Sequence, residues 1–398
     1  MWLPESPQPA TDGPLAGLRV AVKDNVDVAG MPTRAASPAL PHVPAAADAP
    51  AVAVLRAAGC RIVGKANMHE LAFGITSENP WSGDVRNPRL PGHVAGGSSG
   101  GSAAAVVAGL ADVGLASDTG GSARIPAAMC GVAGFRPSTG RYPGDGMLRL
   151  SRAFDSVGLI ARTAAEIELV DAAIAGRPRL EPATLAGVRL AVPGGFYLDG
   201  LEPPVAQAFE AALARLSDAG CELVEADVAG LDAGAKDVHL TIVLHEAEQI
   251  WRAHAEARGT TLRALAAAIA TPQVRELFAR LGAGEAPPED AYREAHDGAR
   301  PALKQAFADY FAETGAAALV APAVPIAPPR SGPRPAEAER RLFDLLTRNM
   351  LPATFAEQPS ICLPIGSDVP VGLLLDGRPG HDERLLSLAL AFERHLAA

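Results

Sequence analysis

The stretch GGSSGGSAAAVVAGLADVGLASDTGGSAR occupies residues 96–124 and begins and ends with clusters rich in glycine and serine. Between the clusters, the Ala/Val-rich residues 103–110 favour a helix, and the short apolar segment 113–116 favours a strand. Gly/Ser runs are typical of flexible linkers, but linkers rarely lead directly into an apolar helix and strand. The stretch therefore predicts two loops held at the ends of packed elements.

Helix and strand alternate on both sides of this stretch. Residues 17–22 and 60–64 have the pattern of apolar strands, and Asp48 is placed to cap a helix between them. Further along, a helix opens at Pro203 and a strand follows at 221–224. This alternation predicts a layered α/β fold with a largely parallel sheet.

Charge and composition exclude several classes of protein. The net charge of −10 and the pI of about 5.4, without basic runs, argue against a partner that is nucleic acid or anionic membrane. No apolar segment is long enough to span a bilayer, and Met1–Glu5 lacks the basic start of a secretory signal. The four cysteines show no CxxC pairing, which favours reduced, buried thiols. We therefore expect a cytoplasmic protein.

Lysine is scarce in this chain. Only four of the 35 basic residues are lysines, namely Lys23, Lys65, Lys236 and Lys304. Lysine can lose its proton when it is buried, whereas arginine keeps its charge in proteins. A lysine at the end of a predicted buried strand, as at position 23, is therefore a candidate base.

Other uses of Gly-rich loops fit less well. A Walker loop needs Gly-Lys-Ser/Thr, which the chain lacks, and residues 96–101 do not have the Gly-x-Gly-x-x-Gly spacing of a dinucleotide loop. Residues 96–100 do match Gly-x-Ser-x-Gly, the nucleophile elbow of α/β-hydrolases. That elbow follows directly on a strand, whereas Pro88 and Pro91 indicate a loop here, although this alternative stays open.

The two clusters together resemble the amidase signature family. Its pattern is a Gly-Gly-Ser-Ser-Gly-Gly loop followed by an Asp-Thr-Gly-Gly-Ser-x-Arg-x-Pro-Ala loop, which residues 96–101 and 118–127 match. The serines Ser98 and Ser122 have the family's separation. The segments around Lys23, at 64–70 and at 370–377 are similar to further family landmarks and follow in the same order.

The resemblance covers about residues 14–180 and 315–398. It implies a three-layer α/β/α fold with a large mixed, mostly parallel central sheet covered by helices. Because no long polar linker interrupts the chain, we expect one domain over residues 1–398. Residues 14–180 and 315–398 would form its catalytic core, and residues 181–314 a mostly helical region on the substrate side.

The resemblance also implies a catalytic triad of Lys23, Ser98 and Ser122. Ser122 would be the nucleophile, Lys23 the base, and Ser98 the relay between them, with a cis peptide bond at Gly97–Ser98. A serine hydroxyl needs a positioned base near pH 7. A lysine base must be neutral, so its pKa must fall from about 10.4 to about 7, a shift that burial can produce.

The remaining site residues are expected around the second cluster. Backbone N–H groups that converge in a glycine-rich turn can form an oxyanion hole, and the candidates are Thr119, Gly120, Gly121 and Ser122. The side chains expected to orient this loop are those of Ser99, Asp118 and Arg124. Lys65 is expected either to be structural or to support the residues of the site from outside. We expect neither a metal nor a cofactor, because His245–Gln249 fails the His-Glu-x-x-His pattern.

Residues 140–146 and 155–158 look most like the indoleacetamide and mandelamide hydrolase branch of the family. This likeness implies hydrolysis of a small aryl or alkyl primary amide through an acyl-enzyme, giving a carboxylate and ammonia. Three alternatives stay open: a carbamate or urea-type (allophanate- or urethane-like) hydrolase, the amidase subunit of a tRNA-dependent amidotransferase, and a non-catalytic binding protein. A homodimer also stays open. Family members usually carry further helix before the lysine strand, and we expect its absence to open the pocket or remove a dimer contact.

Overall fold

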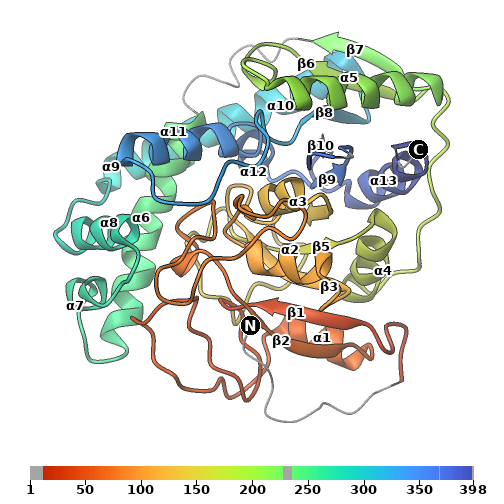
Figure 1. The fold of residues 1–398 in the computed structure, drawn as a ribbon. Coiled ribbons are helices and arrows are strands. Elements are labelled where there is room, and N and C mark those ends of the chain that lie inside the picture. Colours follow the sequence, from red (N-terminus) through yellow and green to blue (C-terminus); the bar gives the residue numbers. More distant parts are fainter. Residues whose placement is uncertain (1–11, 227–234, 367, 397–398) are drawn as a thin grey trace.

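The structure, a computed structural model, describes residues 12–226, 235–366 and 368–396. Its ten strands form one sheet in the order β2-β1-β3-β5-β4-β9-β10-β8-β6-β7. The strands are β1 Arg19–Lys23, β2 Arg61–Ala66, β3 Val113–Asp118, β4 Ala133–Arg136, β5 Ser156–Ala161, β6 Arg189–Pro193, β7 Glu222–Ala226, β8 Ala318–Pro322, β9 Ser360–Pro364 and β10 Gly372–Asp376. Figure 1 shows this sheet running through the molecule.

Helices surround the sheet. They are α1 Pro50–Ala57, α2 Gly100–Val107, α3 Arg124–Cys130, α4 Ala164–Ala175, α5 Pro203–Asp218, α6 Ala235–Glu256, α7 Leu262–Ala267, α8 Pro272–Gly282, α9 Glu289–Arg293, α10 Arg300–Thr314, α11 Ala336–Thr347, α12 Leu351–Phe355 and α13 Asp382–Leu396. Short 3₁₀ turns lie at Glu70–Ala72 and Gly195–Tyr197, and a π-helical turn at Glu294–Ala299 leads into α10.

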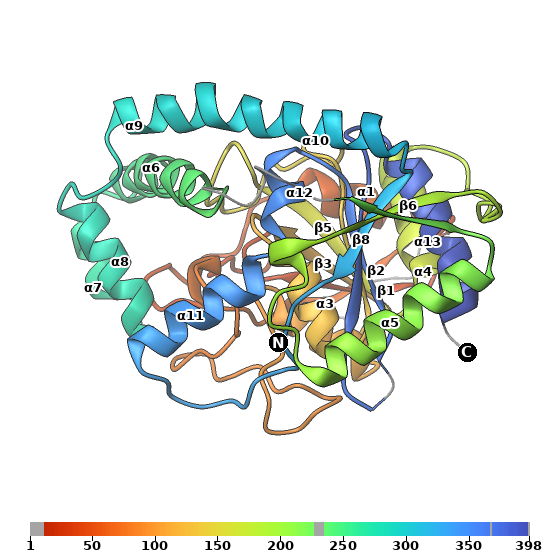
Figure 2. The same ribbon diagram turned by 90° about the horizontal axis from the view of Figure 1, so that it is seen from above.

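Alternating side chains on the strands join different apolar clusters on the two faces of the sheet. On β8, Ala318 and Val320 join a cluster that contains residues of α1, α4, α5 and α13, whereas Leu319 and Ala321 join a cluster with residues of α6 to α10. This alternation is the period of two that strands impose on side chains. Figure 2 shows α4, α5 and α13 on one side of the strands and α6, α7, α8 and α11 on the other. The predicted three-layer α/β/α arrangement is confirmed.

The sheet is mixed, as predicted, but less parallel than predicted. Of the nine pairings between neighbouring strands in the described sheet, four are parallel and five antiparallel. Only residues 365–371 separate β9 from β10, and a parallel pair needs a crossover of roughly a dozen residues or more. The antiparallel strands β5, β4, β9 and β10 occupy the centre, and the parallel pairs lie at both ends.

Most of the elements predicted from local patterns are present. The helix predicted at 103–110 is α2, and the strand at 113–116 is β3. Asp48, however, does not cap α1, whose N-cap is Ala49. The Asp48 carboxylate instead accepts hydrogen bonds from Arg56 Nε (2.6 Å) and from the N–H of Ala29 (2.8 Å). The guanidinium of Arg56, a residue of α1, therefore binds the carboxylate that was predicted to cap this helix.

Two further observations bear on the expected environment. All four cysteines are buried free thiols, as predicted. Within the described residues, no helix has both the length and the apolar character needed to cross a membrane.

Candidate active site

Strand β1 delivers Lys23 to the interior of the protein. Its neighbour β3 runs parallel, with Val22 opposite Leu115, so the carboxyl ends of both strands meet at one edge of the sheet. The Lys23 side chain is fully buried, and its Nζ lies 2.7 Å from Ser98 Oγ and 2.8 Å from Ser117 Oγ. The amine is therefore placed between two hydroxyl groups, one of which belongs to the predicted triad.

Burial decides the charge of this amine. Removal from water disfavours the ammonium form and lowers the pKa of Lys23 from 10.5 to about 7, although Asp118 and Asp155 act in the opposite direction. A substantial fraction of the side chain is then neutral near pH 7. A neutral amine has a lone pair that can accept a proton from the Ser98 hydroxyl.

The first Gly/Ser cluster forms a loop that leads into α2. An α/β-hydrolase elbow requires a strand directly before it, and the described structure has none there. The Gly97–Ser98 peptide bond is cis, as predicted. The carbonyl of Ser98 accepts the N–H of His69 at 3.1 Å. The N–H of Ser99 donates to the carbonyl of Ser122 at 3.1 Å, and the Ser99 hydroxyl donates to the carbonyl of Ser117 at 3.2 Å. Ser99 thus ties the two serine-containing loops to each other and to β3.

Ser122 lies in the turn between β3 and α3 and lines a cavity of about 160 Å³. Unlike Lys23 and Ser98, which are fully buried, Ser122 is partly accessible. The other walls are mostly apolar and include Phe73, Ile75, Leu150, Val243, Leu277 and Phe343. An outer cavity of about 380 Å³ shares part of this wall and has charged side chains at its rim, among them Glu276, Arg280 and Arg340. The predicted nucleophile therefore faces an apolar chamber.

The backbone of the second cluster is held from several sides. The N–H of Gly121 donates to Asp118 Oδ1 at 2.8 Å, so this amide is already occupied. Across the described residues, the N–H groups of Thr119, Gly120 and Ser122 have no hydrogen-bond partner. The Thr119 hydroxyl donates to Asp155 Oδ1 at 2.6 Å. Of the four amides predicted for an oxyanion hole, three are thus available and one supports the turn.

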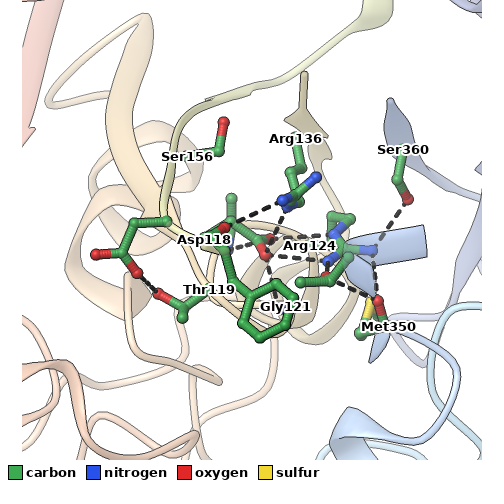
Figure 3. A network of polar contacts seen from close by, with 12 residues as sticks. Asp118, Thr119, Gly121, Arg124, Arg136, Ser156, Met350 and Ser360 are labelled. Atoms are coloured by element: carbon green, nitrogen blue, oxygen red, sulfur yellow. Dashed lines mark hydrogen bonds and ion pairs between the residues drawn. The ribbon is translucent and has the colours of Figure 1, made fainter. Parts of the chain in front are cut away.

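Asp118 is the centre of a buried polar network (Figure 3). Its carboxylate accepts hydrogen bonds from Arg124 Nε and Nη2, both at 3.0 Å, and from the N–H of Ala123 at 3.1 Å. Arg136 Nε lies 3.7 Å away. Burial alone would raise the pKa of Asp118, but the two guanidinium groups outweigh it and hold that pKa well below its usual range. The carboxylate is therefore charged and fixes the turn that carries Ser122.

Arg124 connects this turn to distant parts of the chain. Its Nη1 donates to the carbonyl of Met350 at 3.2 Å and to Ser360 Oγ at 3.1 Å, as Figure 3 shows. Its Nη2 donates to Thr354 Oγ1 at 3.0 Å. The predicted loop-orienting residues Ser99, Asp118 and Arg124 are therefore all buried in contact with the loops of Ser98 and Ser122.

Several residues at the site were not predicted from the sequence. Ser117 contacts Lys23 and also accepts a hydrogen bond from Asn25 Nδ2 at 3.1 Å. Asp155 holds Thr119, and His239 of α6 contacts the carbonyl of Thr119 at 2.9 Å. Ser117 lies within residues 96–124 and Asn25 lies two residues after Lys23, so strand alternation next to Lys23 offered a signal for them. His239 lies in a segment without any motif, and nothing local marks it.

Lys65 makes its polar contacts with residues other than Lys23, Ser98 and Ser122. It pairs with Val22 on β1, so its side chain leaves the sheet on the face opposite to that of Lys23. Its Nζ lies 3.4 Å from Asp24 Oδ1 and 3.0 Å from Thr33 Oγ1. Nowhere in residues 12–226, 235–366 and 368–396 do three His, Cys, Asp or Glu side chains gather in a way that would hold a metal ion.

Comparison with known proteins assigns the chain to a family. The family described as Amidase matches residues 4–386, and the chain belongs to that family. An indoleacetamide hydrolase of Agrobacterium vitis is 35% identical over 391 residues, which cover 96% of this chain and 84% of that protein. A mandelamide hydrolase of Pseudomonas putida is 37% identical over 396 residues, which cover 94% and 78%.

A solved structure shows the same fold. The crystal structure of an amidase superposes with a TM-score of 0.84 at 36% sequence identity, over 97% of this chain and 86% of the other. The sequence-based assignment to the amidase signature family is therefore confirmed.

Proposed function

We propose that this protein is a serine amidohydrolase that cleaves the C–N bond of small primary amides and releases a carboxylate and ammonia. The observation that carries the proposal is the fully buried Lys23 amine, 2.7 Å from Ser98 Oγ, with its pKa lowered to about 7. Its membership of the amidase family and its relatives, an indoleacetamide hydrolase and a mandelamide hydrolase, support the same activity.

The proposed reaction moves one proton along the triad. Neutral Lys23 accepts the proton of the Ser98 hydroxyl, and Ser98 accepts the proton of Ser122 while Ser122 Oγ bonds to the amide carbon. The oxyanion that forms is stabilised by the backbone amides of the Ser122 loop, for which Thr119, Gly120 and Ser122 have unoccupied N–H groups. The proton returns to the nitrogen, ammonia leaves, and water attacks the acyl-enzyme by the same route.

The cavity supports an aryl acyl group. A primary amide loses only ammonia, so recognition must act on the acyl side. The inner cavity of about 160 Å³ is lined largely by Phe, Ile, Leu and Val side chains. Apolar cavities of about 150 Å³ bind benzene. The volume therefore favours an acyl group with a single aromatic ring, as in mandelamide or phenylacetamide.

We also propose the cellular setting that the composition supports. The net charge of −10 and the four buried free thiols fit a cytoplasmic enzyme that meets a small-molecule substrate and has no nucleic-acid or membrane partner. We propose that residues 1–398 form one domain, with a catalytic core of 14–180 and 315–398 and a substrate-side region of 181–314.

A substrate panel read out by ammonia release tests the function. It contains phenylacetamide, mandelamide, indoleacetamide, a short aliphatic amide, allophanate and a carbamate. We expect turnover of the aryl amides by the purified chain alone, and labelling by a fluorophosphonate probe that is lost in Ser122→Ala and kept in the control Ser331→Ala. If the protein preferred allophanate or the carbamate, its substrate would be a urea-type or carbamate compound and the proposed primary amide would be wrong. The proposal would be overturned if the wild-type protein showed no turnover of any substrate and no labelling by the probe.

A further inference from the structure

Helix α6 contributes one polar side chain directly to the loop of the proposed nucleophile. His239, in the third position after Lys236, is 5% exposed and lines the inner cavity together with Thr119, Gly120 and Ser122. Its Nε2 lies 2.9 Å from the carbonyl oxygen of Thr119. This contact joins the substrate-side helices to the turn between β3 and α3.

The contact defines the tautomer of His239. A carbonyl oxygen only accepts hydrogen bonds, so Nε2 must carry a proton and donate it. Burial lowers the pKa of His239 to about 4, and the ring is therefore neutral near pH 7 with its lone pair on Nδ1. Nδ1 is buried and has no hydrogen-bond partner in the described structure. The ring therefore acts on the Thr119 carbonyl as a hydrogen-bond donor.

Fixing the Thr119 carbonyl also fixes the next amide. In a trans peptide the C=O and the following N–H lie in one plane and point in opposite directions. With its carbonyl oxygen held by His239, the Thr119–Gly120 peptide directs the Gly120 N–H away from the imidazole. The Thr119 side chain is held as well, by its 2.6 Å hydrogen bond to Asp155. The peptide is therefore restrained from two sides.

The imidazole itself has little freedom. Its ring centroid lies 5.0 Å from that of Phe154 and 5.8 Å from that of Phe355. A Cβ built on Gly120 would lie 3.2 Å from His239 Cε1 and 3.3 Å from a methyl carbon of Leu351. Glycine at position 120 thus allows the ring to pack directly on the backbone. Aromatic packing, a bare backbone and the hydrogen bond together hold the donor in place.

We propose that His239 is a positioning residue, which orients the Thr119–Gly120 peptide so that the Gly120 N–H can donate to the oxyanion formed at Ser122. This inference rests on the proposed amidase function. It assigns to α6 a part in stabilising the transition state, in addition to lining the acyl pocket.

The experiment compares three variants of His239 with a matched control on the same helix. His239→Leu and His239→Asn remove a donor at the position of Nε2, because the amide of Asn is too short to reach it, whereas His239→Gln restores one. His254→Leu removes another α6 histidine, which packs on Trp251 and not on the Ser122 loop. Circular dichroism establishes which variants fold. Steady-state kinetics then use the best amide of the panel, and inhibition is measured with the matching aldehyde and with the product carboxylate.

We expect kcat to fall roughly 10- to 100-fold in His239→Leu and His239→Asn, less than the 10²–10³-fold cost of losing an oxyanion-hole donor outright. The KM for the amide and the affinity for the carboxylate should change little. Affinity for the aldehyde, which forms a tetrahedral oxyanion on Ser122, should fall in parallel with kcat. His239→Gln should recover most of kcat, and His254→Leu should match the wild type.

Distinct results overturn the inference and the function. If the wild type turns over amides but His239→Asn keeps its kcat and its aldehyde affinity, His239 does not position the hole. An equal loss of carboxylate and aldehyde binding would make it only a wall of the acyl pocket. If His239→Leu fails to fold, the Asn and Gln variants decide alone. Failure of the wild type to react with amide or fluorophosphonate would instead reject the amidase function itself.

Discussion

The proposed role of Lys23 as a base depends on its amine being kept away from water. The amine is fully buried and, among the described residues, its hydrogen-bonding contacts are with hydroxyl and carbonyl oxygens of Ser98 and Ser117. No carboxylate lies within ion-pair distance of it in the described structure. A direct ion pair would raise the pKa and keep the amine charged. Hydroxyl neighbours solvate the amine without holding its proton, which is the condition for a lysine base.

Replacing this amine should separate stability from activity. The pKa of Lys23, lowered from 10.5 to about 7, corresponds at 1.36 kcal/mol per unit to about 4–5 kcal/mol of unfavourable burial near pH 7. Lost hydrogen bonds to two hydroxyls offset about 2 kcal/mol of this. We expect Lys23→Met to be inactive yet about 2–3 kcal/mol more stable, as urea unfolding at pH 7 would measure.

The direction in which stability changes with pH follows from the difference in proton binding between the folded and unfolded chains. Between pH 7 and 10.5 the unfolded chain binds the proton that the folded protein has lost, so the wild-type protein gains stability as the pH rises. The difference in the free energy of unfolding between Lys23→Met and the wild type should therefore shrink between pH 7 and 10.5 and be constant below pH 7. A variant that is less stable at every pH, or that keeps full turnover, contradicts the assignment.

The pH dependence of turnover depends on the same group. Below its pKa of about 7 the amine of Lys23 is charged and cannot accept a proton. We expect kcat/KM for a primary amide to rise with pH, tenfold per unit below an apparent pKa of about 7, and to level off above it. Initial rates of ammonia release measure this profile in the free enzyme. A profile that is flat from about pH 5 to pH 8 would show that another group is the base.

Among the elements, α6, α8 and α11 contribute walls to the proposed acyl pocket. Val243, Leu277 and Phe343 come from these three helices, and they face the loop that carries Ser122. The loop that carries Ser122 is anchored through buried hydrogen bonds of Asp118 and Arg124, whereas the pocket walls are apolar side chains on separate helices. Substrate size can therefore change by substitution on one helix without disturbing the turn.

Phe343→Ala should enlarge the pocket. The ring lines both the inner and the outer cavity, so its removal joins them. We expect kcat/KM for 2-naphthylacetamide, relative to phenylacetamide, to rise about 10- to 100-fold, in line with the 1–3 kcal/mol that small changes of a hydrophobic pocket contribute to discrimination. Leu345→Ala, on the same helix but outside the cavity lining, is the control. An unchanged ratio would place the acyl group elsewhere.

For the whole molecule, the long helical segment is joined to the sheet by a shared core. Ala191 of β6 and Leu319 of β8 belong to the same apolar cluster as Ile242 and Trp251 of α6. Strands β6 and β7, from the segment 181–314, extend the same ten-stranded sheet that contains β1. Such sharing favours one cooperative unit.

A single unfolding transition would test the one-domain proposal. In a variant with Trp2→Phe and Trp81→Phe, the buried Trp251 is the sole tryptophan and reports on the helical segment. Its fluorescence and the far-ultraviolet circular dichroism should change at the same urea concentration with equal slopes. Loss of the fluorescence signal at lower urea would show that residues 181–314 unfold separately, as a second domain.

The local sequence was sufficient to predict those features that depend on residues close together in the chain. The two Gly/Ser clusters, the lysine at a strand end and the α2–β3 segment between them predicted the family, the layered fold and the residues that meet at the site. Such loops need particular residues at fixed spacings, because glycine permits the turns that place the two serines. These constraints are visible in one stretch of chain.

Other features were decided only in three dimensions. The antiparallel centre of the sheet depends on which strands become neighbours, and Asp48 pairs with Arg56 where its position favoured a cap. His239 reaches Thr119, 120 residues away in the sequence, through the packing of α6. Burial also lowers the pKa of Lys23, because it is the assembled core that removes water from the amine. A local sequence pattern does not specify which distant residues will pack together, so these contacts are determined only by the folded structure.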